Sequence, residues 1–230
     1  MPTHVTAVVL AAGSGRRVGA DVPKQFLPLA GRPMVAYSLE LFEAAGSVRS
    51  VVVAFPSEGP SGVEMSRFPK VAARVSGGET RQASLARALA VLPEPTDAVL
   101  VHDAARPLLD STLVDRLLAG LDETCDGVIP VVPLEDTIKR VGPDRMVVAQ
   151  LDRDQVWRVQ TPQCFRREAL EDSLAKAAAA GLESTDCSQM LSAAGYRVRV
   201  VEGDPLNFKI TRAADLWLAE KVLASRRENP

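Results

Sequence analysis

The chain has 230 residues, of which 47% are hydrophobic and 24% are charged. This composition is that of an ordinary soluble globular protein, and the longest apolar runs are the length of a strand, so we expect no membrane span. A formal net charge of −2 argues against a general nucleic-acid binder, because such proteins need a strong basic excess. Any basic residues that bind anions must therefore act locally.

The length suits one α/β domain, and no linker, repeat or low-complexity tract divides the chain. We therefore expect residues 1–230 to form a single domain. No charged segment followed by an apolar stretch and a cleavage site opens the chain, which predicts a cytoplasmic protein. The cysteines Cys125, Cys164 and Cys187 are far apart and are joined by only two histidines, a pattern that does not favour a zinc site.

Apolar, β-branched runs alternate with amphipathic segments from the N-terminus onward. Alternation of this kind predicts an α/β fold with a mostly parallel, doubly wound (Rossmann-like) sheet covered on both faces. Pro33 is expected at the first position of a helix, and Ser111 is expected to cap another. The expected strands are Val5–Leu10, Ser50–Phe55, Lys70–Val75, Ala98–Val101 and Gly127–Val131, and the expected helices are Met34–Ala45, Thr80–Leu92 and Ser111 to about Glu123.

The alternation breaks at about 134–160, where Thr137–Val141 and Met146–Leu151 flank the turn Gly142-Pro143-Asp144. This pattern predicts a projecting β-hairpin, which we call the arm. Because a lone hairpin is marginal in water, we expect a second copy of the chain to support it. The remaining expected elements are helices at Arg167–Ala180 and Ser188–Ala194, a strand at Tyr196–Val201, a strand-like segment at Asn207–Ile210, and a helix from Arg212 or Ala213 to about Arg226.

A loop of small residues follows the first strand, where open α/β sheets bind ligands. Ala11, Ala12, Gly13 and Gly15 let backbone amides approach an anion closely, and the arginines at 16 and 17 stand immediately behind them. Triphosphate binding is one interpretation, and an ordinary strand-to-helix turn is the other. The loop is neither a dinucleotide fingerprint, since valine replaces the third glycine, nor a Walker motif, which ends in Gly-Lys-Ser/Thr.

Charged residues follow at two other expected loops. Lys24, in the proline-stiffened Pro-Lys-Gln, is either a solvated surface lysine or an ammonium held near the same phosphates. Asp103 and Arg106 end the fourth strand, where Asp103 is a candidate to orient a ribose, a metal or a lysine. The alternative is an ion pair between Asp103 and an arginine that only fixes the loop. The adjacent His102 is expected to be structural.

Two further segments are candidates for the same edge of the sheet. Lys209 interrupts an apolar segment, so its ammonium must enter a polar pocket or pair with an anion. Gly78, Glu79 and Ser84 combine a flexible turn with a helix start, and could hold a base or a ribose. Simple capping of the helix by Thr80 is the alternative.

Taken in order, these motifs resemble one family. Leu-Ala-Ala-Gly-x-Gly-x-Arg, Pro-Lys-Gln, Gly-Gly-x-x-Arg-x-x-Ser, His-Asp-Ala-Ala-Arg-Pro, Thr-Pro-Gln and Asn-x-Lys-x-Thr together resemble the 2-C-methyl-D-erythritol 4-phosphate cytidylyltransferases of isoprenoid-precursor synthesis. The ribitol-5-phosphate cytidylyltransferases have a similar plan, and Ala105 favours the former family. Leu10, where some relatives have proline, Leu206, where some are polar, and Phe208, where a β-branched residue is usual, depart from the pattern.

The resemblance implies roles for individual residues. It implies that Arg17 and Lys24 stabilise the transition state, that Lys209 contacts phosphate, and that Thr137 and Arg153 on the arm reach the sugar phosphate held by a partner subunit. It also implies substrate contacts at Asp103, Thr161 and Thr185. The expected CTP site comprises Ala11, Ala12, Gly13, Gly15, Gly78, Glu79, Ser84, Asp103 and Arg106.

The chemistry of nucleotidyl transfer agrees with these residue types. The acceptor oxygen attacks the α-phosphorus in line, so catalysis consists mainly of positioning and charge stabilisation. A phosphate acceptor has its second pKa at about 6 and needs no general base near pH 7, which suits a chain with two histidines. We expect Mg²⁺ to be held mainly by the triphosphate, with Asp103 as a candidate ligand. The alternative, from a different class of function, is a module that binds a nucleotide without catalysis.

Overall fold

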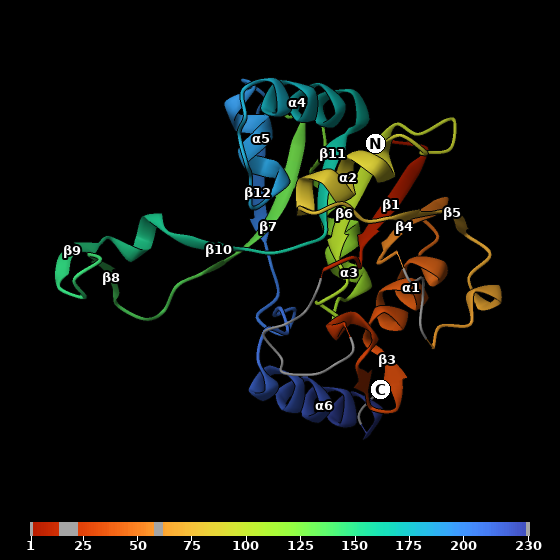
Figure 1. Ribbon diagram of the computed structural model, residues 1–230, viewed down its shortest axis with the longest axis horizontal. Coiled ribbons are helices and arrows are strands. Elements are labelled where there is room, and N and C mark those ends of the chain that lie inside the picture. The colour runs from red at the N-terminus through yellow and green to blue at the C-terminus, as the bar shows by residue number, and fades with distance from the viewer. Residues whose placement is uncertain (1, 14–22, 58–61, 229–230) are drawn as a thin grey trace.

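The computed structural model describes residues 2–13, 23–57 and 62–228. Its centre is an eight-stranded sheet in the order β10-β7-β11-β6-β1-β4-β5, with β12 paired to β7 (Figure 1). The strands are β1 (Val5–Leu10), β4 (Ser50–Phe55), β5 (Val71–Ser76), β6 (Ala98–Asp103), β7 (Gly127–Pro133), β10 (Trp157–Val159), β11 (Gln163–Arg166) and β12 (Val198–Glu202).

Most neighbouring strands are parallel, as the alternating pattern predicts. β1 pairs in parallel with both β4 and β6, β4 pairs with β5, and β12 pairs with β7. The exceptions are β10 and β11, which return from the arm and run antiparallel to their neighbours. The predicted α/β fold with a mostly parallel, doubly wound sheet is therefore confirmed.

Helices cover both faces of the sheet. They are α1 (Met34–Ala44), α2 (Arg81–Leu89), α3 (Ser111–Gly120), α4 (Arg167–Ala179), α5 (Cys187–Ala193) and α6 (Ala213–Glu228). Because side chains alternate along a strand, Val9 packs in the cluster formed with α1 and α3, while Val8 packs in the cluster formed with α2, α4 and α5. The helix α6 lies apart, against a third cluster with Leu29, Met34 and Leu108.

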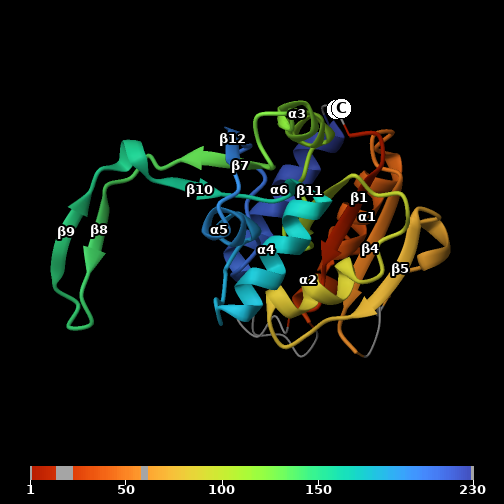
Figure 2. The same ribbon diagram turned by 90° about the horizontal axis from the view of Figure 1, so that it is seen from above.

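The arm projects away from the sheet and helices in both views (Figures 1 and 2). It consists of β8 (Ile138–Val141) and β9 (Val147–Leu151), an antiparallel pair whose register shifts between Arg140 and Val141. A single-turn helix, η4 (Arg153–Gln155), links it to β10. This placement confirms the predicted hairpin. Short elements elsewhere are η2 (Lys24–Phe26), η3 (Met65–Arg67) and the β2 (Pro28–Leu29) and β3 (Arg32–Pro33) pair.

Several local predictions are wrong. Asp110, not Ser111, caps α3, because its carboxylate accepts a hydrogen bond from the Thr112 amide at 2.9 Å. Pro33 stands one residue before the helix instead of at its first position. The segment 207–210 forms no strand, although the Ile210 amide donates to the Ala105 carbonyl at 2.8 Å. Among the described residues, no helix is long and apolar enough to cross a bilayer.

Candidate active site

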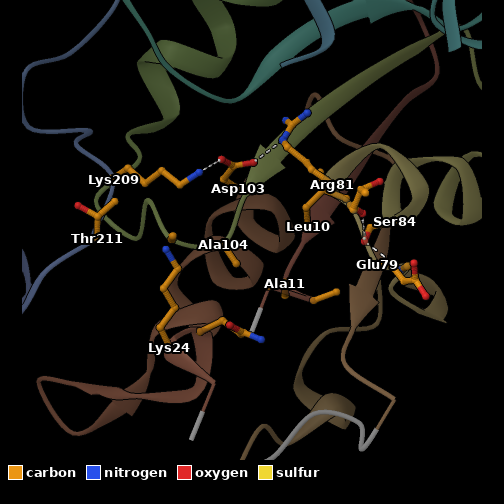
Figure 3. A pocket seen from close by; sticks show the side chains of 16 residues that line it. Leu10, Ala11, Lys24, Glu79, Arg81, Ser84, Asp103, Ala104, Lys209 and Thr211 are labelled. Carbon is orange, nitrogen blue, oxygen red and sulfur yellow. Dashed lines mark hydrogen bonds and ion pairs between the residues drawn. The ribbon is translucent and has the colours of Figure 1, made fainter. Parts of the chain in front are cut away.

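A cleft of about 710 Å³ opens at the carboxyl ends of β1 and β6 (Figure 3). The turn before α2, the η2 turn and the segment around Lys209 complete its walls, so residues far apart in the chain meet at one sheet edge. The lining side chains include three cations and two carboxylates, which leaves a positive balance suited to an anionic ligand. The lining residues are Leu10, Ala11, Ala12, Gly13, Lys24, Gln25, Gly78, Glu79, Thr80, Arg81, Ser84, Asp103, Ala104, Ala105, Lys209 and Thr211.

Asp103 is shared between two cations. Arg81 Nε donates to one carboxylate oxygen at 3.1 Å, and Lys209 Nζ donates to the other at 2.7 Å. Burial by itself would raise the pKa of Asp103, but the positive charges of Arg81 and Lys209 outweigh it and hold that pKa well below its usual value. The carboxylate therefore stays ionised and fixes Lys209 at the edge of the cleft.

This arrangement settles two expectations about the ion pairs. The prediction that Lys209 pairs with an anion is confirmed, although its side chain is 40% exposed and is not buried. The alternative prediction, an ion pair between Asp103 and an arginine, is also met. The arginine that donates to Asp103 is Arg81. Arg106 instead donates to the carbonyls of Asn207 at 2.8 Å and Val159 at 3.2 Å, which ties the segment around Lys209 to the base of the arm.

A buried hydrogen-bonded chain supports Asp103 from below. Its backbone amide donates to the Thr161 hydroxyl at 3.0 Å, and that hydroxyl lies 3.2 Å from His102 Nδ1. His102 Nε2 lies 3.1 Å from the Ser38 hydroxyl. Burial lowers the pKa of His102 to about 4, so the imidazole is neutral near pH 7. His102 is therefore structural, as the sequence predicts, and Thr161 lies buried behind the residues that line the cleft.

The described part of the loop after β1, up to Gly13, forms one wall of the cleft. Ala11, Ala12 and Gly13 line it, but the Ala11 amide is engaged by the Ala54 carbonyl at 2.8 Å. Gly15 and Arg17, which carry two of the predicted roles, lie outside the described residues. Lys24 lines the cleft and donates to the Ile210 carbonyl at 3.0 Å, which holds its ammonium beside the segment that contains Lys209.

The turn before α2 brings glycine and serine together. The Gly78 amide donates to the Ser84 hydroxyl at 3.0 Å, and that hydroxyl donates to the Thr80 carbonyl at 2.9 Å. A Cβ at Gly77 would stand 2.0 Å from the Ala12 side chain, so only glycine allows this close approach of two cleft walls. The Thr80 hydroxyl also accepts from the Ala83 amide, which confirms that Thr80 caps the helix.

The arm residues and Thr185 do not line the cleft of their own chain. Thr137 is exposed, and Arg153 donates to the Glu135 carbonyl at 2.5 Å at the base of the arm. Thr185 is exposed just before α5, whose first residue, Cys187, is 3.3 Å from Arg81 Nη1. The structure thus gathers Lys24, Asp103, Lys209 and the two glycine turns in one cleft, and leaves the arm residues outside it.

Comparison with known proteins agrees with this geometry. The model of the family 2-C-methyl-D-erythritol 4-phosphate cytidylyltransferase matches residues 5–225. The chain belongs to this family. The Xylella fastidiosa enzyme of that name is 41% identical, with 98% of this chain and 100% of the relative covered. The Parasynechococcus marenigrum enzyme is 38% identical, with 96% of this chain and 99% of the relative covered.

Solved structures of the same family share the fold. The Thermus thermophilus 2-C-methyl-D-erythritol 4-phosphate cytidylyltransferase is 36% identical with a TM-score of 0.78, covering 95% of this chain and 98% of that one. The Anaerococcus prevotii 4-diphosphocytidyl-2C-methyl-D-erythritol synthase is 25% identical with a TM-score of 0.84, covering 96% of this chain and 99% of that one. The cytidylyltransferase family therefore accounts for both the sequence and the architecture.

Two residues of the cleft were not predicted from the sequence. Arg81 lines the cleft and holds Asp103, and its signal was present as the arginine of Gly-Gly-x-x-Arg-x-x-Ser. Gln25 is buried and also lines the cleft, directly after Lys24. Gln25 is the last residue of the Pro-Lys-Gln motif, but a neutral amide beside a lysine does not by itself indicate a role, so its burial in the cleft wall is what singles it out.

Proposed function

We propose that this chain transfers the cytidylyl group of CTP to 2-C-methyl-D-erythritol 4-phosphate. The products are pyrophosphate and 4-diphosphocytidyl-2-C-methyl-D-erythritol, an intermediate of the non-mevalonate isoprenoid precursor pathway. The observation that carries the proposal is the cationic cleft, in which Lys24 and the Asp103-bound Lys209 face the glycine turn at Gly78. Family membership supplies the substrate class.

The mechanism assigns charge stabilisation to the cations of the cleft. The acceptor phosphate is already ionised near pH 7 and attacks the α-phosphorus without a general base. Lys24 lines the cleft, where its ammonium can stabilise the negative charge of the pentavalent transition state. We assign Arg17 the same role by resemblance, and Lys209 a contact with the acceptor phosphate.

We assign the remaining contacts by the same resemblance. The nucleotide is held by Ala11, Ala12, Gly13, Gly15, Gly78, Glu79, Ser84, Asp103 and Arg106, and the acceptor by Asp103, Thr137, Arg153, Thr161, Thr185 and Lys209. For Arg106 and Thr161 the observed hydrogen bonds favour an indirect role, because Thr161 accepts from the Asp103 amide and Arg106 donates to the Asn207 carbonyl, two residues before Lys209.

Magnesium fits the donor set of the cleft. Mg²⁺ in nucleotide enzymes keeps several waters and binds through substrate phosphates and one or two carboxylates. Asp103, which is ionised, and Glu79 are the carboxylates that line the cleft, so we propose that Asp103 helps to hold the ion. When bound, the metal would neutralise part of the triphosphate charge. Among the described residues no larger acidic or histidine cluster offers a second type of site.

We further propose that the chain is one nucleotidyltransferase domain whose arm joins two copies into a homodimer. Large apolar side chains on the arm are strongly exposed, with Met146 at 65% and Val147 at 63%, and pairing with a second copy would bury them. Arg153 and Thr137 of one copy would then reach the cleft of the other. Three free cysteines, all buried, are compatible with a cytoplasmic location.

The test of the substrate is direct. Purified protein is incubated with CTP, Mg²⁺ and either methylerythritol phosphate or ribitol 5-phosphate, and pyrophosphate release is followed. Turnover with methylerythritol phosphate is expected. Ribitol 5-phosphate is included because the ribitol-5-phosphate cytidylyltransferases share a similar plan of motifs. Faster turnover with it would favour that alternative activity.

The test of the shared site uses complementation. An Arg153→Ala chain and a Lys24→Ala chain are each expected to be weakly active, but a mixed dimer contains one cleft with both residues intact. Mixing should therefore restore part of the activity. No recovery in dimers verified to be mixed would contradict a role for Arg153 across the interface.

A further inference from the structure

Gln25 is a buried polar side chain whose amide donor is unused. It is 2% exposed, it lines the cleft, and its Nε2 finds no hydrogen-bond partner among the described residues. A buried donor without a partner costs free energy, and native proteins rarely leave one at a position without a purpose. The structure therefore contains an amide donor at the cleft that lacks an acceptor.

The backbone around Gln25 is pinned in place. In the η2 turn the Phe26 amide donates to the Pro23 carbonyl at 2.9 Å, and the Leu27 amide donates to the Lys24 carbonyl at 3.1 Å. The Phe26 ring stacks on Phe55 with centroids 6.0 Å apart. The turn is therefore held on both sides of Gln25, which leaves rotation of the side chain as the way for its amide to meet an acceptor.

The chemistry of the cleft defines the missing acceptor. Nε2 of a glutamine only donates, and the oxygens of Asp103, the buried carboxylate of the cleft, accept from Arg81 and Lys209 and not from Gln25. Lys24 and Lys209 make the cleft suited to anionic oxygen. A phosphate oxygen of a bound substrate is the acceptor that satisfies both the donor and the charge.

We propose that Gln25 is a substrate-binding residue whose Nε2 donates to a phosphate oxygen, either of the nucleotide or of the acceptor. This inference rests on the proposed cytidylyl transfer and adds a neutral donor to its cationic groups. A hydrogen bond to a charged group that is made only in the complex improves binding without stabilising the free protein. Gln25 therefore lowers the stability of the free enzyme and raises the affinity for the substrate.

The experiment compares Gln25→Met, which keeps the size and removes the amide, with Gln160→Met. Gln160 is a matched control, because it is 5% exposed and its amide is satisfied on both sides by the backbone of Asp204. Thermal unfolding without ligand should show Gln25→Met at least as stable as the wild type, and Gln160→Met less stable. A Gln25→Met chain that is less stable or fails to fold would overturn the proposal, since the amide would then have a protein partner.

Binding is measured with CTP, pyrophosphate and methylerythritol phosphate, each by the shift in unfolding temperature and by the KM where turnover occurs. Gln25→Met should weaken one of these ligands by about tenfold to a hundredfold. A loss for CTP and pyrophosphate assigns the bond to the nucleotide, and a loss for methylerythritol phosphate alone assigns it to the acceptor. Unchanged binding of all three would overturn the proposal.

Gln25→Glu identifies the ligand atom. A carboxylate would repel a phosphate oxygen, so this variant should lose more affinity than Gln25→Met. Affinity equal to or above that of the wild type would overturn the assignment of a phosphate acceptor. The CTP and pyrophosphate measurements need no turnover, so they test Gln25 even if methylerythritol phosphate proves not to be the substrate. Failure of the proposed function and failure of this inference thus give different results.

Discussion

The cleft contains charged side chains that pair with one another within one chain, whereas the arm exposes large apolar side chains to solvent. In the cleft, Asp103 is nearly buried and bound on both oxygens, and the cations that hold it come from α2 and from the segment before α6. On the arm, Met146 and Val147 are exposed, and β8 and β9 pair mainly with each other. The contrast indicates that the cleft is organised within one chain, whereas the arm needs a second surface to bury its side chains.

The largest effect is expected from Lys24, the cation at the wall of the cleft. Lys24→Ala should lower kcat by about a hundredfold to a thousandfold, or roughly 3–4 kcal/mol of transition-state stabilisation. Lys176→Ala is the control, because this exposed lysine pairs with Asp172 of α4 and lies over the Tyr196 ring, does not line the cleft, and should leave kcat unchanged. Steady-state kinetics at saturating CTP measures both. A loss below about threefold for Lys24→Ala would remove it from catalysis.

The next effect tests whether the cleft is organised through Arg81. Arg81→Met should cost roughly 3 kcal/mol of unfolding free energy, because removing one partner leaves the buried carboxylate of Asp103 less compensated. Arg199→Met removes an arginine from an exposed pair with Asp122 and should cost much less. Denaturant titration compares the two. Equal losses would show that the cleft pair behaves like a surface pair.

The buried histidine predicts a pH window for the same region. Burial lowers the pKa of His102 to about 4 from 6.5, with Asp103 opposing the shift and Arg106 adding to it. Between these two pH values His102 is protonated in the unfolded chain but neutral in the folded chain. The free energy of unfolding therefore falls by about 3 kcal/mol as the pH drops from 6.5 to 4. His102→Asn should lose less across that window in denaturant titrations. A parallel pH profile for the variant would contradict the assignment.

The smallest effect on folding is expected on the arm. Val147→Asp should change the unfolding free energy of the dilute monomer by about 0.5 kcal/mol or less, because the side chain is exposed. Sedimentation should nevertheless show weaker self-association, since a charge would be buried in the interface. A large loss of monomer stability would mean that the arm packs within its own chain, which would remove the contrast with the cleft.

The sequence pattern by itself predicted most helices and strands, and the edge of the sheet at which the cleft lies. β1 and β4 have the predicted bounds, because a buried parallel strand is a continuous apolar run that ends sharply at polar or small residues. The turn between β8 and β9 was recognisable from its glycine and proline. Helix ends were less accurate: α3 ends at Gly120 instead of near Glu123, since helix propensity changes little across such an end.

Only the tertiary structure decided which groups meet. Asp103 binds Arg81 and Lys209, which lie 22 and 106 residues away along the chain, so no local pattern could choose them over Arg106. The strands β10 and β11 escaped prediction because their pairing with β7 depends on how the arm returns to the sheet. Likewise, the unsatisfied amide of Gln25 exists only once the η2 turn is packed against the cleft. Periodicity is local and is written in the sequence, whereas ion pairing and burial depend on distances that only folding creates.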